Sequence, residues 1–324
     1  MDFRTDILGA PYEAVDLPLA ADDEGEVLAT LVRRRAAAEG ATGPRRAVLY
    51  VHGFVDYFFQ THLADFYVER GYDFYALDLR KYGRSLRPHH SPNFVRRLDA
   101  YDEELDEAVR IIRAVDGHDQ LLVNGHSTGG LVTALWAHRR AGQGLVDGLF
   151  LNSPFLSMPA ALLVRTLGAP ALDALGRLAG TRKLPMPPAP HYVHSLHRDF
   201  RGSWDFDLAL KPAEGFGVYA GWLAAIQQGH RQVRRGLAID CPVLLMASTA
   251  STLTATRWDA ALHTTDGVLR ADDIAALAPR LGRHITTVRI ADGVHDLVLS
   301  GESARKQVFQ ELDRWLTAYL PAAG

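Results

Sequence analysis

Short, almost wholly apolar runs recur along the chain, and they limit its fold more than any other feature. They lie at 47–51, 74–77, 121–123, 148–151, 242–246 and 287–290. Such runs are typical of strands buried on both faces of a parallel sheet. Helical patterns are interspersed with them, at 60–70, 99–115, 129–141, 271–281 and 302–320. This alternation predicts an α/β protein with a doubly wound, mostly parallel sheet and helices on both faces.

Two further strands are predicted near the amino terminus. Residues 12–19 and 26–34 flank Asp22-Asp23-Glu24-Gly25, whose residue types are typical of a hairpin turn. With the six apolar runs, these two strands predict an eight-stranded sheet. The alternation then breaks between Pro154 and about Asp240, where a proline-rich segment and several aromatic residues replace the strand pattern.

The strongest local signal is Gly125-His126-Ser127-Thr128-Gly129-Gly130, which lies between an apolar run and a helical pattern. A serine on such a sharp strand-to-helix turn has its hydroxyl lifted out of the sheet. Gly125 and Gly129 omit β-carbons where strand and helix crowd together. The helix amino end offers oriented N–H groups to a developing oxyanion. Ser127 is therefore predicted to be a nucleophile; the alternative is a glycine-rich turn whose serine only caps the helix.

The end of strand 47–51 predicts an oxyanion hole. The strand runs into His52-Gly53-Phe54, and Gly53 permits a turn that directs the next N–H over the sheet edge. In proteins whose nucleophilic serine lies on such a strand-to-helix turn, one oxyanion donor comes from this loop, and the other from the residue after the nucleophile. The predicted donors are the N–H groups of Phe54 and Thr128. His52 is interpreted as a residue that hydrogen-bonds the loop.

The general base and the acid are expected after the last two strands. Of the 14 histidines, His295 lies on the loop before the final helix and is the predicted base. The acid should follow strand 242–247, but a Ser- and Thr-rich stretch, 248–265, replaces the expected short loop. The candidates are Asp259, Asp266, Asp272 and Asp273. Asp266 is preferred because it opens the next helix, whereas Asp292 and Asp296 are interpreted as turn residues.

These motifs occur in a fixed order along the chain, together with Asp78-Leu79-Arg80-Lys81-Tyr82-Gly83-Arg84-Ser85. In this order the chain resembles the α/β-hydrolase superfamily, and within it the monoacylglycerol lipase, lysophospholipase and serine aminopeptidase-like branch. The branch has Gly-His-Gly where Lys81-Tyr82-Gly83 stands, in a loop interpreted as structural. It also has Gly-x-x-Asp after the acid strand, where this chain has Ala247-Ser248-Thr249-Ala250. Asp266-Gly267-Val268-Leu269 restores that pattern after an insertion.

The order of the motifs also decides the domain organisation. A chain of 324 residues fits two domains, or one α/β core with an insertion. Because the serine precedes the irregular stretch and its base follows it, we predict one core (1–154 and 241–324) with a helical cap at 155–240. The resemblance implies that this cap is a lid over the serine. Its aromatic residues are expected to contact substrate, chiefly Phe155, Tyr192, Trp204 and Trp222.

The predicted activity is hydrolysis of carboxylic esters of lipophilic acyl chains through an acyl-enzyme. The alternatives are an amide-cleaving aminopeptidase, which needs acids in the cap to bind an amine, and a non-catalytic binding protein on the same fold. No metal or cofactor is expected, and the spacing of His191, His194 and His197 is a weak signal for a metal site.

Composition excludes several other classes of protein. With 35 basic and 38 acidic residues, the formal net charge is −3, so no basic domain indicates nucleic-acid binding. The single cysteine, Cys241, excludes an internal disulfide framework and a multi-cysteine metal site. No run approaches the length of a membrane span, and the amino-terminal residues lack the apolar region of a secretory signal. A cytoplasmic protein with no stable membrane insertion is expected.

Overall fold

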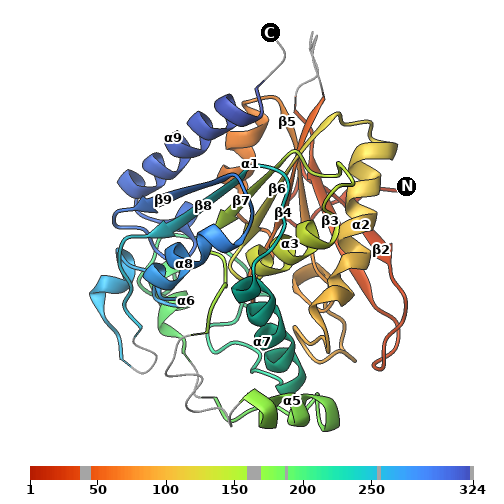
Figure 1. Ribbon diagram of the computed structural model, residues 1–324, viewed down its shortest axis with the longest axis vertical. Coiled ribbons are helices and arrows are strands. Elements are labelled where there is room, and N and C mark those ends of the chain that lie inside the picture. The colour runs from red at the N-terminus through yellow and green to blue at the C-terminus, as the bar shows by residue number, and fades with distance from the viewer. Residues whose placement is uncertain (37–44, 159–168, 187–188, 254–256, 322–324) are drawn as a thin grey trace.

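The computed structural model describes all residues except 37–44, 159–168, 187–188, 254–256 and 322–324. A single mixed sheet runs through the molecule (Figure 1), in the order β1-β2-β3-β5-β4-β6-β7-β8-β9. Its strands are β1 (Arg4–Thr5), β2 (Glu13–Pro18), β3 (Leu28–Arg34), β4 (Arg46–Val51), β5 (Tyr72–Asp78), β6 (Gln120–His126), β7 (Gly148–Asn152), β8 (Val243–Ser248) and β9 (Ile285–Ile290). The eight predicted strands are all present. The ninth, β1, has only two residues and pairs with β2.

The centre of the sheet is parallel, and its strand order reverses at β4. The chain first places β5 on one side of β4, then β6 on the other, and continues outward through β7, β8 and β9. Val51 at the end of β4 pairs with Gly125 of β6, so the loops that follow these two strands leave the sheet at the same level. Ligands of open α/β sheets bind in the crevice at such a reversal point.

Helices cover both faces of the sheet, as predicted. They are α1 (Thr61–Val68), α2 (Asp102–Arg110), α3 (Thr128–Arg139), α5 (Ala169–Leu178), α6 (His191–Leu196), α7 (Ala220–Arg235), α8 (Ala271–Leu277) and α9 (Glu302–Tyr319). Helices α1 and α9 pack into the core on one face of the sheet, and α2, α3 and α8 pack into the core on the other. None of the helices in the described residues is long and apolar enough to cross a membrane.

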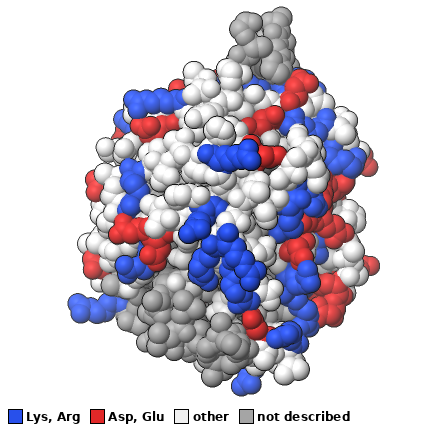
Figure 2. Space-filling view, viewed as in Figure 1, with Lys and Arg blue, Asp and Glu red and all other residues white. Residues whose placement is uncertain are grey.

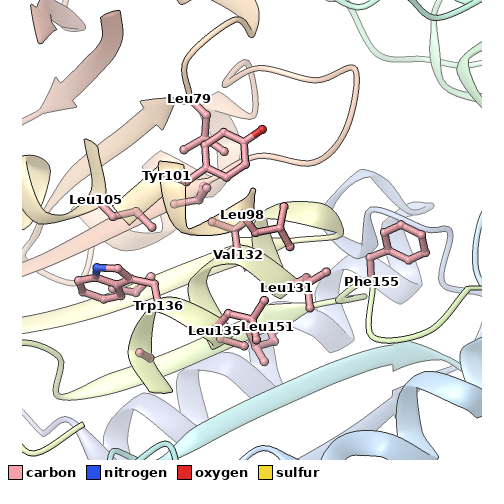
Figure 3. Close-up of a cluster of buried hydrophobic side chains, with 14 of the residues drawn as sticks. Leu79, Leu98, Tyr101, Leu105, Leu131, Val132, Leu135, Trp136, Leu151 and Phe155 are labelled. Atoms are coloured by element: carbon pink, nitrogen blue, oxygen red, sulfur yellow. The ribbon is translucent and has the colours of Figure 1, made fainter. Parts of the chain in front are cut away.

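Apolar side chains on both faces of each central strand form two cores. Along β4, Ala47, Leu49 and Val51 pack into one core, whereas Val48 and Tyr50 pack into the other. This burial of both faces explains why the central strands appear in the sequence as continuous apolar runs. Figure 3 shows part of the first core, in which α3 contributes Leu131, Val132, Leu135 and Trp136. Phe155, just after β7, lies at one end of this group.

The stretch between β7 and β8 contains helices and adds no strand to the sheet in its described part. Its helices α5 and α7 lie at the lower end of the molecule in Figure 1. Helix α7 packs closely on α3. A Cβ added to Gly229 of α7 would lie only 3.0 Å from the Leu135 side chain of α3. Arg231 of α7 pairs with Asp173 of α5 at 3.0 Å. On the face shown in Figure 2, basic and acidic side chains are both present, with a small basic group near its centre.

Candidate active site

Ser127 occupies the sharp turn between β6 and α3. Its φ of 51° and ψ of −117° lie outside the regions that side chains normally prefer. The Ser127 N–H donates to the carbonyl of Asn152 at the end of β7 (3.0 Å). A Cβ on Gly125 would lie 2.8 Å from the Gly129 carbonyl oxygen, so strand and helix approach closely at this turn. The turn therefore holds the serine in a strained conformation that its surroundings fix.

The structure brings together Ser127, His295 and Asp266, which are far apart in the sequence. His295 Nε2 lies 2.9 Å from Ser127 Oγ, and His295 Nδ1 lies 2.9 Å from Asp266 Oδ2. The three residues are 7%, 3% and 0% exposed. Such a chain can move a proton from the hydroxyl to the imidazole while the carboxylate stabilises the imidazolium.

Asp266 is the only one of the four predicted acid candidates that contacts His295 in the described structure. Its Oδ1 accepts the N–H groups of Val268 and Leu269, both at 2.8 Å, which fixes the carboxylate for His295. Asp259 caps the short helix Ala260–His263, where its carboxylate accepts the Ala261 N–H (2.9 Å). Asp272 pairs with Arg289, and Asp273 with Arg270.

Two backbone N–H groups near Ser127 donate to no acceptor among the described residues, those of Thr128 and Phe54. Thr128 is the first residue of α3, where the helix dipole favours negative charge. Gly53, which precedes Phe54, lies against the serine, since a Cβ there would be 3.1 Å from Ser127 Cβ. His52 has the loop contacts expected from the sequence: Nδ1 bonds the Gly53 carbonyl (2.8 Å), and Nε2 accepts the Leu79 N–H (3.1 Å).

Three of the four predicted substrate contacts lie around this group. The Trp222 ring stacks on Phe54 with 4.1 Å between centroids. The Tyr192 ring meets His295 edge-on at 5.7 Å. Phe155 donates its N–H to the Ser127 carbonyl oxygen (2.9 Å).

Trp204 does not join them. Its indole stacks on His62 and donates to the Leu299 carbonyl (2.7 Å), beside α1 and α9. Its position is explained by packing beside α1 and α9, away from Ser127.

Asp296 lies in a turn, as interpreted from the sequence, since its carbonyl accepts the Leu299 N–H (2.8 Å), but its side chain also has buried partners. The residue is 2% exposed, and its carboxylate accepts the side-chain amides of Asn152 (2.7 Å) and Gln60 (3.1 Å). These bonds tie the His295 loop to the end of β7 and the start of α1. The nearby His126 is buried and its pKa is lowered, chiefly by desolvation, so it stays neutral. A polar Asn152 closing the apolar run 148–151 is the sequence signal that could have indicated this network.

An α/β sheet with a serine elbow at its reversal point and a Ser-His-Asp chain defines the α/β-hydrolase class. The sequence model of one of its families, described as serine aminopeptidase, S33, matches residues 42–298. The chain therefore belongs to this family of hydrolases. No curated protein matches the sequence.

Solved structures share the fold at low sequence identity. The chain is similar to a soluble variant of monoglyceride lipase from Saccharomyces cerevisiae in complex with a substrate analogue, with a TM-score of 0.63, 16% identity, and coverage of 93% of this chain and 94% of that one. It is also similar to a monoacylglycerol lipase from Paleococcus ferrophilus (TM-score 0.61, 17% identity, coverage 89% and 99%). A thermostable carboxyl esterase from Bacillus coagulans in complex with glycerol gives a TM-score of 0.63 at 15% identity, with coverage of 94% and 98%.

Proposed function

We propose that this protein is a serine hydrolase that cleaves carboxylic esters of lipophilic acyl chains. The observation that carries the proposal is the pair of 2.9 Å contacts from Asp266 through His295 to Ser127. The N–H groups of Thr128 and Phe54, which have no acceptor in the part of the chain that the structure describes, add a place for a developing oxyanion.

The reaction proceeds in two acyl transfers. Ser127 Oγ attacks the ester carbonyl carbon, and His295 Nε2 takes the hydroxyl proton. The N–H groups of Thr128 and Phe54 stabilise the tetrahedral oxyanion. As that intermediate collapses, the C–O bond breaks, the alcohol leaves with the proton from His295, and an acyl-enzyme remains. Water then attacks this ester, His295 takes its proton and returns it to Ser127, and the carboxylic acid is released.

The side chains around the serine support an apolar acyl group. Phe54, Phe155 and Trp222 supply aromatic surface beside Ser127, and such surface with few polar groups suits acyl chains. The similar structures named as monoacylglycerol lipases and a carboxyl esterase agree with esters of this kind. We therefore place the substrate among monoacylglycerols, lysophospholipids and simple carboxylic esters.

Amide cleavage is the second candidate, which the family's description as an aminopeptidase favours. An amine-binding pocket requires a carboxylate that is available near the serine. Among the described residues, the buried carboxylates of this region already have partners: Asp56 binds Lys211, Asp266 binds His295, and Asp296 binds side-chain amides. In the cap, Asp205 pairs with Arg198 at the surface. These contacts favour the ester.

Labelling with a fluorophosphonate tests the proposal. The wild type is expected to label at Ser127 and the S127A variant is not; an unlabelled wild type would favour a non-catalytic binding protein. The D266N variant should lose about 10³–10⁴-fold in kcat, because the histidine then has the wrong tautomer. The D259N variant serves as the matched control and should keep wild-type activity. Turnover of aminoacyl anilides in preference to p-nitrophenyl esters would replace the ester assignment by the amide one.

Chain-length preference tests whether the acyl chain lies against Trp222. The W222A variant removes the stack on Phe54 and is expected to raise KM for long-chain p-nitrophenyl esters about tenfold, with little effect on the acetate. The W204A variant is the control, because Trp204 packs beside α1 and α9. Equal effects of both variants on all chain lengths would refute this placement of the acyl chain.

The lone thiol supports a reducing location for the enzyme, and we place it in the cytoplasm. Cys241 is the single cysteine of the sequence, so it has no disulfide partner within the chain, and burial raises the pKa of its thiol to about 12, which leaves it little nucleophilic character. The expected partner is a small-molecule ester, with neither nucleic acid nor stable membrane insertion.

A further inference from the structure

A buried ion pair joins the stretch before α7 to the loop that carries Phe54. Lys211 Nζ lies 2.6 Å from Asp56 Oδ1, and the two side chains are 6% and 1% exposed. The pair bridges 155 positions of sequence. A buried ion pair gives little net stability compared with apolar residues of the same size. We therefore interpret the pair as holding the loop that carries Phe54 in position, rather than as a source of stability.

The backbone around Lys211 is built to aim this side chain. Asp207 accepts the Lys211 N–H with its carbonyl (2.9 Å) and the Ala209 N–H with its carboxylate (2.7 Å), which closes a turn. The Asp207 N–H in turn donates to Tyr57 Oη (2.7 Å), next to Asp56. The Phe206 ring packs on Phe59 with 4.8 Å between centroids. Residues 206–211 are thus fastened to residues 56–59 by polar and aromatic contacts.

Asp56 transmits this attachment to the oxyanion loop. Its Oδ2 accepts the Gly53 N–H at 3.3 Å, which holds the His52–Gly53 peptide, one peptide bond before the one that carries the Phe54 N–H. Burial opposes ionisation of Asp56, but the charge of Lys211 holds the pKa of this carboxyl below its usual value. The carboxylate therefore stays charged, with one oxygen on Lys211 and the other on the loop.

We infer that Asp56 is a positioning residue for the Phe54 oxyanion donor, and that Lys211 keeps its carboxylate oriented toward Gly53. This inference rests on the proposed function, because it assigns a role within the same site. According to this inference, residues 206–211 help to stabilise the transition state, because they hold Asp56 and through it the loop of the oxyanion donor. Loss of the pair should then reduce kcat while substrate binding is preserved.

Three variants separate the roles of the charge and of the acceptor. K211M leaves the buried carboxylate without its cation. D56L/K211M replaces the pair by apolar side chains, an exchange that buried ion pairs often tolerate, but it removes the acceptor for Gly53. D56N/K211M removes the charge and keeps a side-chain oxygen for that N–H. The matched control is R231M, which breaks the Arg231–Asp173 pair between α7 and α5.

The measurements are kcat and KM on a p-nitrophenyl ester, normalised to the number of sites that fluorophosphonate labels at completion, together with the melting temperature. We expect kcat of K211M and D56L/K211M to fall about tenfold or more, less than the 10²–10³-fold that loss of a whole oxyanion donor causes. KM should stay within about twofold. D56N/K211M should keep most of the wild-type kcat, and R231M all of it.

If K211M does not fold, the two double variants still test the inference, because both lack a buried charge. Equal kcat in D56L/K211M and D56N/K211M would overturn it while leaving the proposed function intact. An equal loss in R231M would also overturn it, as general damage to the stretch between β7 and β8. A wild type that neither labels nor turns over ester would overturn both the proposed function and the inference.

Discussion

Acid should destabilise this protein through His230, a buried histidine of α7. The residue is 1% exposed, and its Nε2 donates to the carbonyl of Phe155 (2.8 Å), whose own N–H holds the Ser127 carbonyl. Burial lowers the pKa of His230 from 6.5 to about 4. The folded protein therefore binds no proton at this site until the pH approaches 4, whereas the unfolded chain binds one below about 6.5.

The sign and size of the effect follow from this difference. Because only the unfolded state gains the proton between pH 6.5 and 4, stability is lost as the pH falls through that window. At pH 5 the loss from His230 alone amounts to about 2 kcal/mol relative to pH 7.5. With an unfolding entropy of about 2.1 cal/mol/K per residue, this lowers the melting temperature by about 3 °C.

The assay compares urea unfolding at pH 7.5 and pH 5, followed by tryptophan fluorescence, for the wild type and H230Q. A glutamine amide can donate to the Phe155 carbonyl but does not titrate, so the difference between the two pH values should shrink by about 2 kcal/mol in the variant. The control is H263Q, at an exposed position, where the pH dependence should equal that of the wild type. The same pH dependence in H230Q and the wild type would refute the reasoning.

Two further predictions concern packing and charge. In G130A the new Cβ would lie 2.8 Å from Pro154 Cβ, well inside normal carbon contact. We therefore expect the free energy of unfolding to fall by about 1–3 kcal/mol and fluorophosphonate labelling to slow. The control G301A, where no atom lies within 4 Å of the new Cβ, should melt like the wild type. R80M leaves the wholly buried Glu104 without the guanidinium that binds it at 2.6 Å, and should cost about 3–5 kcal/mol in urea unfolding; a loss below 1 kcal/mol would contradict this account.

The features that the sequence predicts well are those encoded locally. The apolar runs indicate central strands because both faces of each strand are buried, and the turn at Ser127 is recognisable because close backbone approach requires glycine beside it. The loop 78–85 is likewise structural, as expected: Asp78 accepts the Phe58 N–H, and Ser85 donates to the Asp78 carbonyl. In each case the sequence signal lies within one segment, although the bond between Asp78 and Phe58 spans 20 positions of the chain.

Contacts between distant segments are less accessible to such reasoning. Nothing beside Lys211 indicates that it meets Asp56, and nothing beside Asp296 indicates that two side-chain amides bury it. A charged residue in a polar stretch is normally solvated, so local composition favours the exposed interpretation. Only the fold brings the compensating partner, and these two networks therefore become visible only in three dimensions.

The proposed acid, Asp266, shows how a distant residue can nonetheless be located. The stretch after β8 leaves the sheet at Ala250 and returns to the same place, where the Asp266 N–H donates to the Ala250 carbonyl (3.0 Å) and Thr252 donates to the Asp266 carbonyl (2.9 Å). The excursion is therefore closed by backbone bonds at its base. Asp266 consequently stands where an acid directly after the strand would stand, still facing His295. An insertion closed in this way lengthens the chain without moving Asp266 away from His295, which is why the residues after the excursion, rather than their distance from β8, indicate the proposed acid.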